Sequence, residues 1–189
     1  MLIKENAIFF RLTPVQACRV IYGANPFPEA VEISRYLASH CAPDARILVL
    51  GSEPEIYFYS HRRSATSYIC TFPLVERQPY AAAMQKDMIR EIEQANPEYV
   101  VYVHIRTSWL QSDDNADKRI TDWFETYARK HLQPVGQVEI LSDKQVEYRW
   151  FSPQETVVPT RSDCWLDIFK RRANDKIPTE SNKQESAQL

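Results

Sequence analysis

Charged and aromatic side chains follow the predicted strands of this 189-residue sequence, where they could bind a ligand. In an open parallel sheet, ligands bind beyond the carboxyl ends of the strands. Arginine forks recognise phosphate or carboxylate groups, and aromatic side chains offer a flat surface to a sugar ring. We therefore expect a pocket for an anionic or sugar-like group on one rim of the sheet. Its candidate ligand-binding residues are Glu53, Arg62, Arg63, Arg106 and Trp109.

The same rim also has a structural interpretation. In that case Glu53 or Glu55 pairs with a nearby arginine and holds the loops together, while Tyr57 and Tyr59 pack the following helix on the sheet. Structural ion pairs are commoner than binding sites, and a fold alone does not establish a function. Both interpretations are compatible with the sequence, and the structural one is the commoner arrangement.

The sequence contains no convincing pair of catalytic residues. Glu53 and Glu55 lie too close in sequence to act as the two carboxyl groups of a glycosidase. Cys70 lies in a predicted β-rich segment and not at a helix N-terminus, which argues against a nucleophile activated by His61. His104, inside a predicted strand, is typical of a hydrogen-bonded core histidine. We therefore predict no catalytic residue.

The composition argues against several classes of partner. The three glycines cannot form a glycine-rich phosphate loop, so no nucleotide cofactor is expected. The four cysteines lack metal-ligand spacing, so no metal site is expected. A net charge of -2 gives no attraction to nucleic acid. No run of about 18 apolar residues is present, so the sequence as written predicts neither a membrane span nor a signal peptide.

Alternating helix and strand patterns predict an α/β fold. Three apolar or β-rich segments separated by helices favour right-handed crossovers and a mainly parallel sheet covered on both faces, a three-layer Rossmann-like sandwich. A turn at 142–144 predicts an antiparallel hairpin at the sheet edge. We expect residues 1–172 to form a single α/β domain and 173–189 a disordered polar tail. The expected helices are 14–22, 28–41, a short one after Glu55, 80–95, 113–131 and 164–171, and the expected strands are 46–51, 66–72, 98–105, 135–141 and 145–151.

Several long motifs carry a family resemblance. They are YGANPFPEA at 22–30, LGSEPEIYFY at 50–59, RRSAT at 62–66, and the segment 99–110, which ends in TSWL. Over about residues 9–150 the chain resembles the soluble C-terminal region of bacterial membrane glycosyltransferases of the dolichyl-phosphate-mannose-protein mannosyltransferase-like kind. In that family a bundle of membrane helices precedes such a segment, and the catalytic acidic residues lie in loops near the first of those helices. The resemblance therefore carries no catalytic residue over to this chain.

The resemblance implies an accessory, extracytoplasmic domain that is not an enzyme on its own. Its expected partners are a glycan, a lipid-linked sugar or a protein acceptor, together with the membrane domain. If the chain is complete as written, a cytoplasmic location is expected instead. Two rival functions stay open: a small independent hydrolase or transferase that uses the strand-end rim, and a protein-interaction domain.

Overall fold

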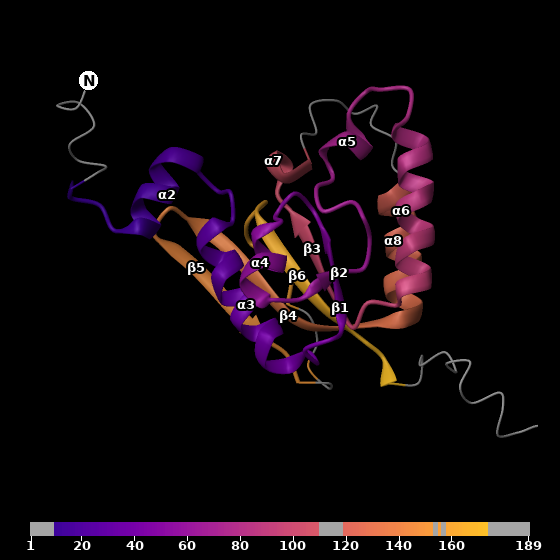
Figure 1. Ribbon diagram of the computed structural model, residues 1–189. Helices are drawn as coiled ribbons and strands as arrows, with labels where there is room; N and C mark the ends of the chain where they lie inside the picture. Colours follow the sequence, from indigo (N-terminus) through magenta and orange to yellow (C-terminus); the bar gives the residue numbers. More distant parts are fainter. Residues whose placement is uncertain (1–9, 110–118, 153–154, 156–157, 174–189) are drawn as a thin grey trace, which may run out of the picture.

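The computed structural model describes residues 10–109, 119–152, 155 and 158–173. Its centre is a six-stranded mixed sheet with the order β2-β1-β3-β6-β4-β5 (Figure 1). The first three strands in this order pair in parallel, whereas β6, β4 and β5 pair antiparallel. The α/β class is confirmed, but parallel pairing is confined to one half of the sheet. The strands are β1 (Arg46–Leu50), β2 (Arg63–Ser64), β3 (Tyr99–His104), β4 (Leu132–Ser142), β5 (Gln145–Trp150) and β6 (Trp165–Arg171).

Helices cover both faces of the sheet (Figure 1). Side chains of α3 and α4 join one buried apolar cluster, and side chains of α6 and α8 join another on the opposite face. The side chains of β3 alternate between these two clusters, since Val101 and Val103 face α3 while Val100 faces α6. The helices are α2 (Pro14–Tyr22), α3 (Phe27–His40), α4 (Glu55–Ser60), α5 (Phe72–Val75), α6 (Ala81–Ala95), α7 (Arg106–Trp109) and α8 (Arg119–His131).

Local sequence signals define the helix ends as predicted. Thr13 and Gln16 form a capping box at the start of α2, and Gly23 ends that helix with a φ of 61°. Asn96, in the left-handed conformation, ends α6. The predicted hairpin is also confirmed, because β4 and β5 pair antiparallel and β5 lies at the sheet edge.

The predicted helix over 164–171 is wrong. This segment is β6, which pairs antiparallel with both β3 and β4. Leu166 and Ile168 are fully buried on the α3 face, whereas Phe169 packs against the cluster on the other face. The segment therefore alternates with a period of two residues, and its length allowed either interpretation.

The predicted β-rich segment 66–72 is also wrong. The only pairing near it is the two-residue strand β2, directly before Ala65. Thr66 and Ser67 bond to the Glu91 side chain in α6 instead of joining a strand. Of the predicted helix over 113–131, residues 119–131 are confirmed as α8, and 113–118 lie outside the described residues. Residues 174–189 of the predicted tail lie outside them too.

Among the described residues, none of the helices is long and apolar enough to cross a lipid bilayer. The longest, α6, has 15 residues and a polar outer face. This finding concerns the described part of the chain alone.

Gly51 sits where three side chains meet at the end of β1, and we predict that Gly51→Ala destabilises the fold. An added Cβ would lie 2.6 Å from Val103 Cγ2 and 2.8 Å from Ser108 Oγ, and would also meet the Glu53 carboxylate. Overpacking of this kind costs about 2 kcal/mol. Gly23→Ala is the comparison, because nothing lies within 4 Å there and its loss, about 1–3 kcal/mol, comes from the backbone conformation alone.

Urea unfolding of both variants measures the difference in the free energy of unfolding. Because Gly51 does not have a positive φ, a Gly51→Ala variant as stable as the wild type would show that crowding does not require glycine at position 51.

Candidate functional site

The carboxyl ends of β1 and β3 carry a closed network of hydroxyl and carboxyl groups. Ser108 Oγ donates to Glu53 Oε2 over 2.8 Å and accepts from the backbone N–H of Ser52 over 2.9 Å. The Ser52 and Thr71 hydroxyls lie 3.1 Å apart, and Thr71 Oγ1 donates to the Ser108 carbonyl. Glu53, Thr71 and Ser108 are all buried. The network therefore fastens the strand-end loops to one another.

Glu53 is an unusual carboxyl group in this network. Burial raises its pKa to about 7, the Ser108 hydrogen bond opposes the shift, and the charge of Glu55 adds to it. Such a group can exchange a proton near neutral pH. Its side chain is only 3% exposed, however, so a substrate has no access to it. The geometry favours a structural role for Glu53, with the Ser108 hydroxyl as its partner in place of the expected arginine.

Arg62 and Arg63 lie at the opposite end of the sheet from Glu53. Arg63 pairs in register with Arg46, the first residue of β1, so both arginines stand near the amino ends of the parallel strands. The Arg62 guanidinium donates to the carbonyls of Ala38 and Cys41 over 2.8 and 2.7 Å. These contacts satisfy backbone acceptors at the end of α3. The expectation that all the candidates share one rim is therefore wrong.

Arg106 and Trp109 do lie at the carboxyl end, in α7 directly after β3. Arg106 is exposed, so it is available to an anionic ligand. Trp109 is 5% exposed, its Nε1 donates to the Val103 carbonyl over 2.7 Å, and it belongs to the α6-side core. Trp109 therefore has no free ring face for a sugar.

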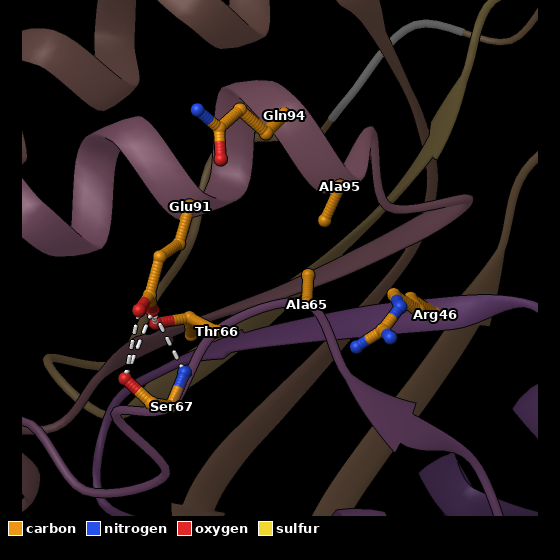
Figure 2. A pocket seen from close by; sticks show the side chains of 7 residues that line it. All are labelled: Arg46, Ala65, Thr66, Ser67, Glu91, Gln94 and Ala95. Carbon is orange, nitrogen blue, oxygen red and sulfur yellow. Dashed lines mark hydrogen bonds between the residues drawn. The ribbon is translucent and has the colours of Figure 1, made fainter.

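An open hollow of about 500 Å³ lies between α6 and the segment after β2 (Figure 2). Figure 2 shows Glu91 reaching from α6 to Thr66 and Ser67 on one side of the hollow, whereas Arg46 lies on the opposite side. Burial opposes ionisation of Glu91, but hydrogen bonds from Thr66 and Ser67 outweigh it and lower its pKa. Arg46 Nη1 donates to the Ser64 carbonyl over 2.8 Å. Glu91 is thus already occupied in holding this segment on α6.

A row of polar side chains crosses the antiparallel half of the sheet, and sequence analysis missed it. His104 Nε2 lies 2.9 Å from Asp167 Oδ2, and the His104 ring stacks on Trp165 with centroids 4.1 Å apart. Gln137 Nε2 donates to Asp167 Oδ1 over 3.1 Å, and Arg149 Nη1 donates to Gln137 Oε1 over 3.0 Å. His104 thus contacts a carboxylate, but its side chain is 27% exposed, so it is not the core histidine that was predicted.

The row ends at Glu139, a fully buried residue. Its carboxylate accepts from Arg149 Nη2 over 2.9 Å and from the backbone N–H of Ser162 over 2.7 Å. Arg149 also pairs with Glu147 over 2.6 Å on the same strand. This part of the row stabilises the segment that leads into β6, and the alternation of 165 to 169 was the signal that could have revealed the arrangement.

Among the described residues, no group of three or more His, Cys, Asp or Glu side chains is placed to hold a metal ion. Comparison of the chain with protein-family models, with curated proteins and with solved structures gave no match. The candidate sites therefore stand on geometry alone.

We predict that Glu53 makes stability depend on pH. Because its folded pKa is about 7 and the ordinary value of a glutamate is 4.5, the folded protein holds this proton more tightly than the unfolded chain. The free energy of unfolding should therefore fall as pH rises from 4.5 to 7, by on the order of 2 kcal/mol. Glu53→Gln should remove this decline. Urea unfolding at several pH values checks it.

Glu76→Gln is the control for this experiment, since Glu76 is an exposed residue. It should leave the pH dependence of the wild type intact. A Glu53→Gln variant that loses stability with pH as steeply as the wild type would contradict the assignment.

We predict that Arg149→Ala costs about 2 kcal/mol of stability, because it removes the nearer cation of the buried Glu139 carboxylate, at 2.9 Å, and leaves only Arg161 at 3.8 Å. Arg90→Ala is the matched control, since Arg90 pairs with Asp87 at the surface, and should cost less than about 0.5 kcal/mol. Thermal unfolding compares the two variants. Equal small losses would show that the remaining donors hold Glu139 without Arg149.

Proposed function

We propose that this chain is an accessory, extracytoplasmic α/β domain of a membrane glycosyltransferase-like protein. It positions a glycan, a lipid-linked sugar or a protein acceptor, while the membrane part carries out the transfer. The proposal is supported by the family resemblance over most of the chain and by one structural observation. That observation is the distribution of side chains on α2, which buries a charged residue and exposes apolar ones.

Helix α2 buries a charged residue and exposes apolar ones. Arg19 is 6% exposed and pairs with the buried Glu29, and its guanidinium also donates to the carbonyls of Gly23 and Asn25. Val20 is 61% exposed and Ile21 is 54% exposed. We call the exposed apolar residues on and beside this helix the α2 surface: Phe10, Val15, Val20, Ile21, Tyr22 and Phe27.

A surface helix of a globular protein normally turns its apolar stripe toward the core. In α2 the one buried residue is the polar anchor Arg19, and the apolar side chains of Val15, Val20, Ile21 and Tyr22 are exposed around the helix. Exposed apolar area of this kind is typical of a surface covered by another protein or a membrane. The α2 surface stands near the strand-end rim, because Thr107 Oγ1 donates to Asn25 Oδ1 over 2.6 Å. In the family, membrane helices precede this part of the chain. We therefore assign the membrane part to the α2 surface.

The rival functions fit the geometry less well. An independent enzyme needs an accessible nucleophile or base with a partner, and the buried Glu53 network leaves no access. A protein-interaction domain would use the same α2 surface with a different partner. We also propose that the fold is a three-layer Rossmann-like sandwich, since helices flank both faces of its parallel half.

We predict that a photo-crosslinking residue at position 20 of the full-length protein, in native membranes, links to the membrane-helix part. The same residue at position 125, an exposed site on α8, is the matched control and should give no such link. Mass spectrometry of the linked peptides identifies the contact. Val20→Asp should abolish the contact and change the stability of the isolated chain by less than about 0.5 kcal/mol.

Links from position 20 only to a second copy of this chain would assign the α2 surface to a homodimer and overturn the proposal. Equal links from positions 20 and 125 would also contradict it, because they would indicate random collision.

A further inference from the structure

A groove lined by aromatic and polar side chains runs between α3 and β5. Its volume is about 630 Å³, within the range of small-molecule sites. None of its residues belongs to the predicted rim, and the proposed docking of the α2 surface leaves the groove without a role. The residues that line the groove are Glu32, Arg35, Tyr36, Ser39, Tyr148 and Trp150.

Two aromatic side chains of β5 form the floor of the groove, and contacts with α3 and β4 fix the position of one of them. Tyr148 and Trp150 are two residues apart on β5, so their side chains share one face, and each is 38% exposed. The Trp150 ring stacks on Tyr36 with centroids 3.9 Å apart and planes 5° apart. It also lies over Gly136 of β4, where an added Cβ would come within 2.6 Å of Trp150 Cζ3. Glycine at this position lets the indole lie flat against the sheet.

Polar side chains from α3 form the wall of the groove. Glu32 and Arg35 pair with each other one helical turn apart, and their side chains are 47% and 68% exposed. Burial raises the pKa of Tyr148 to about 12, and the negative charges of Glu29 and Glu32 contribute, so its hydroxyl stays a hydrogen-bond donor at neutral pH. The wall thus offers a carboxylate, a guanidinium and hydroxyl groups beside a flat apolar floor.

We propose that this groove binds a pyranose ring of a glycan. Tyr36 and Gly136 cover the two faces of the Trp150 ring, and Tyr36 is also stacked on His40, so the free ring face is that of Tyr148, which is 38% exposed. A sugar ring has an apolar face, which would stack on Tyr148, and hydroxyl groups at its edge, which would bond to the carboxylate and guanidinium groups. One carboxylate and one guanidinium cancel in charge, so the groove favours a neutral sugar over a phosphate or a sulfate. The exposed aromatic side chains supply area that is already ordered, which limits the entropy lost on binding.

The biological role of this groove rests on the proposed function. The groove makes that proposal more specific, because it identifies a neutral sugar as the ligand that the accessory domain binds. The two proposals are tested separately. Binding of sugar is measured on the isolated chain, whereas docking is measured by crosslinks from the α2 surface. A failure of one experiment leaves the other result standing.

The test is a two-dimensional NMR titration of the chain with methyl α-D-mannopyranoside and methyl β-D-glucopyranoside. We expect saturable shifts of the Trp150 indole N–H and of α3 amides, with a dissociation constant on the order of 1 mM for at least one sugar. Tyr148→Ala should weaken binding at least about tenfold, a loss of about 1.4 kcal/mol, and Trp150→Ala, which removes the ring that Tyr36 packs against, should weaken it as well. Tyr80→Ala, at an exposed ring outside the groove, should leave it unchanged.

Arg35→Ala separates binding from folding, since this exposed side chain is not part of the core. It should weaken sugar binding while the amide spectrum stays native. No saturable shift with either sugar, or shifts confined to residues outside the groove, would overturn the proposal. So would tighter binding of an extended peptide that adds a strand to the edge of β5, which would make the groove a peptide site.

Discussion

The pairing of β6 with both β3 and β4 is the contact on which the rest of the structure depends. On one side of β6 lies the parallel half of the sheet, and on the other lies the antiparallel hairpin. Six residue pairs join β6 to β3 without a register shift, whereas a bulge interrupts its pairing with β4 between Pro134 and Gly136. This strand therefore fixes the position of β5 relative to α3, and with it the geometry of the aromatic groove.

The two faces of the antiparallel half serve different purposes. On the α3 face, Leu166 and Ile168 complete the apolar core, and Tyr148 and Trp150 continue the surface outward into the groove. On the other face, Asp167 begins the polar row that ends at the buried Glu139. A buried carboxylate is tolerated only when every oxygen has donors, and the arginine and backbone donors around Glu139 meet that condition.

Local signals predicted local structure well, and long-range pairing escaped them. The Thr13 cap, the Asn96 turn and the apolar run of β1 each depend on neighbours in sequence, so the corresponding elements were predictable. The placement of β6 between β3 and β4 depends on residues far apart in the chain. The candidate site failed for the same reason, because adjacency to a predicted strand did not tell which end of the sheet Arg62 would occupy. The groove joins α3 to β5, and no sequence spacing connects those elements.

The most direct test of the central claim is the cellular location and orientation of the native protein. Cells of the source organism, with any outer wall or membrane opened, would be treated with protease from outside and fractionated, and the chain detected with an antibody raised against it. An accessory extracytoplasmic domain predicts that the antibody signal pellets with membranes and is lost to the external protease. A chain that stays in the soluble fraction, and is cleaved only after the cells are lysed, would contradict the account.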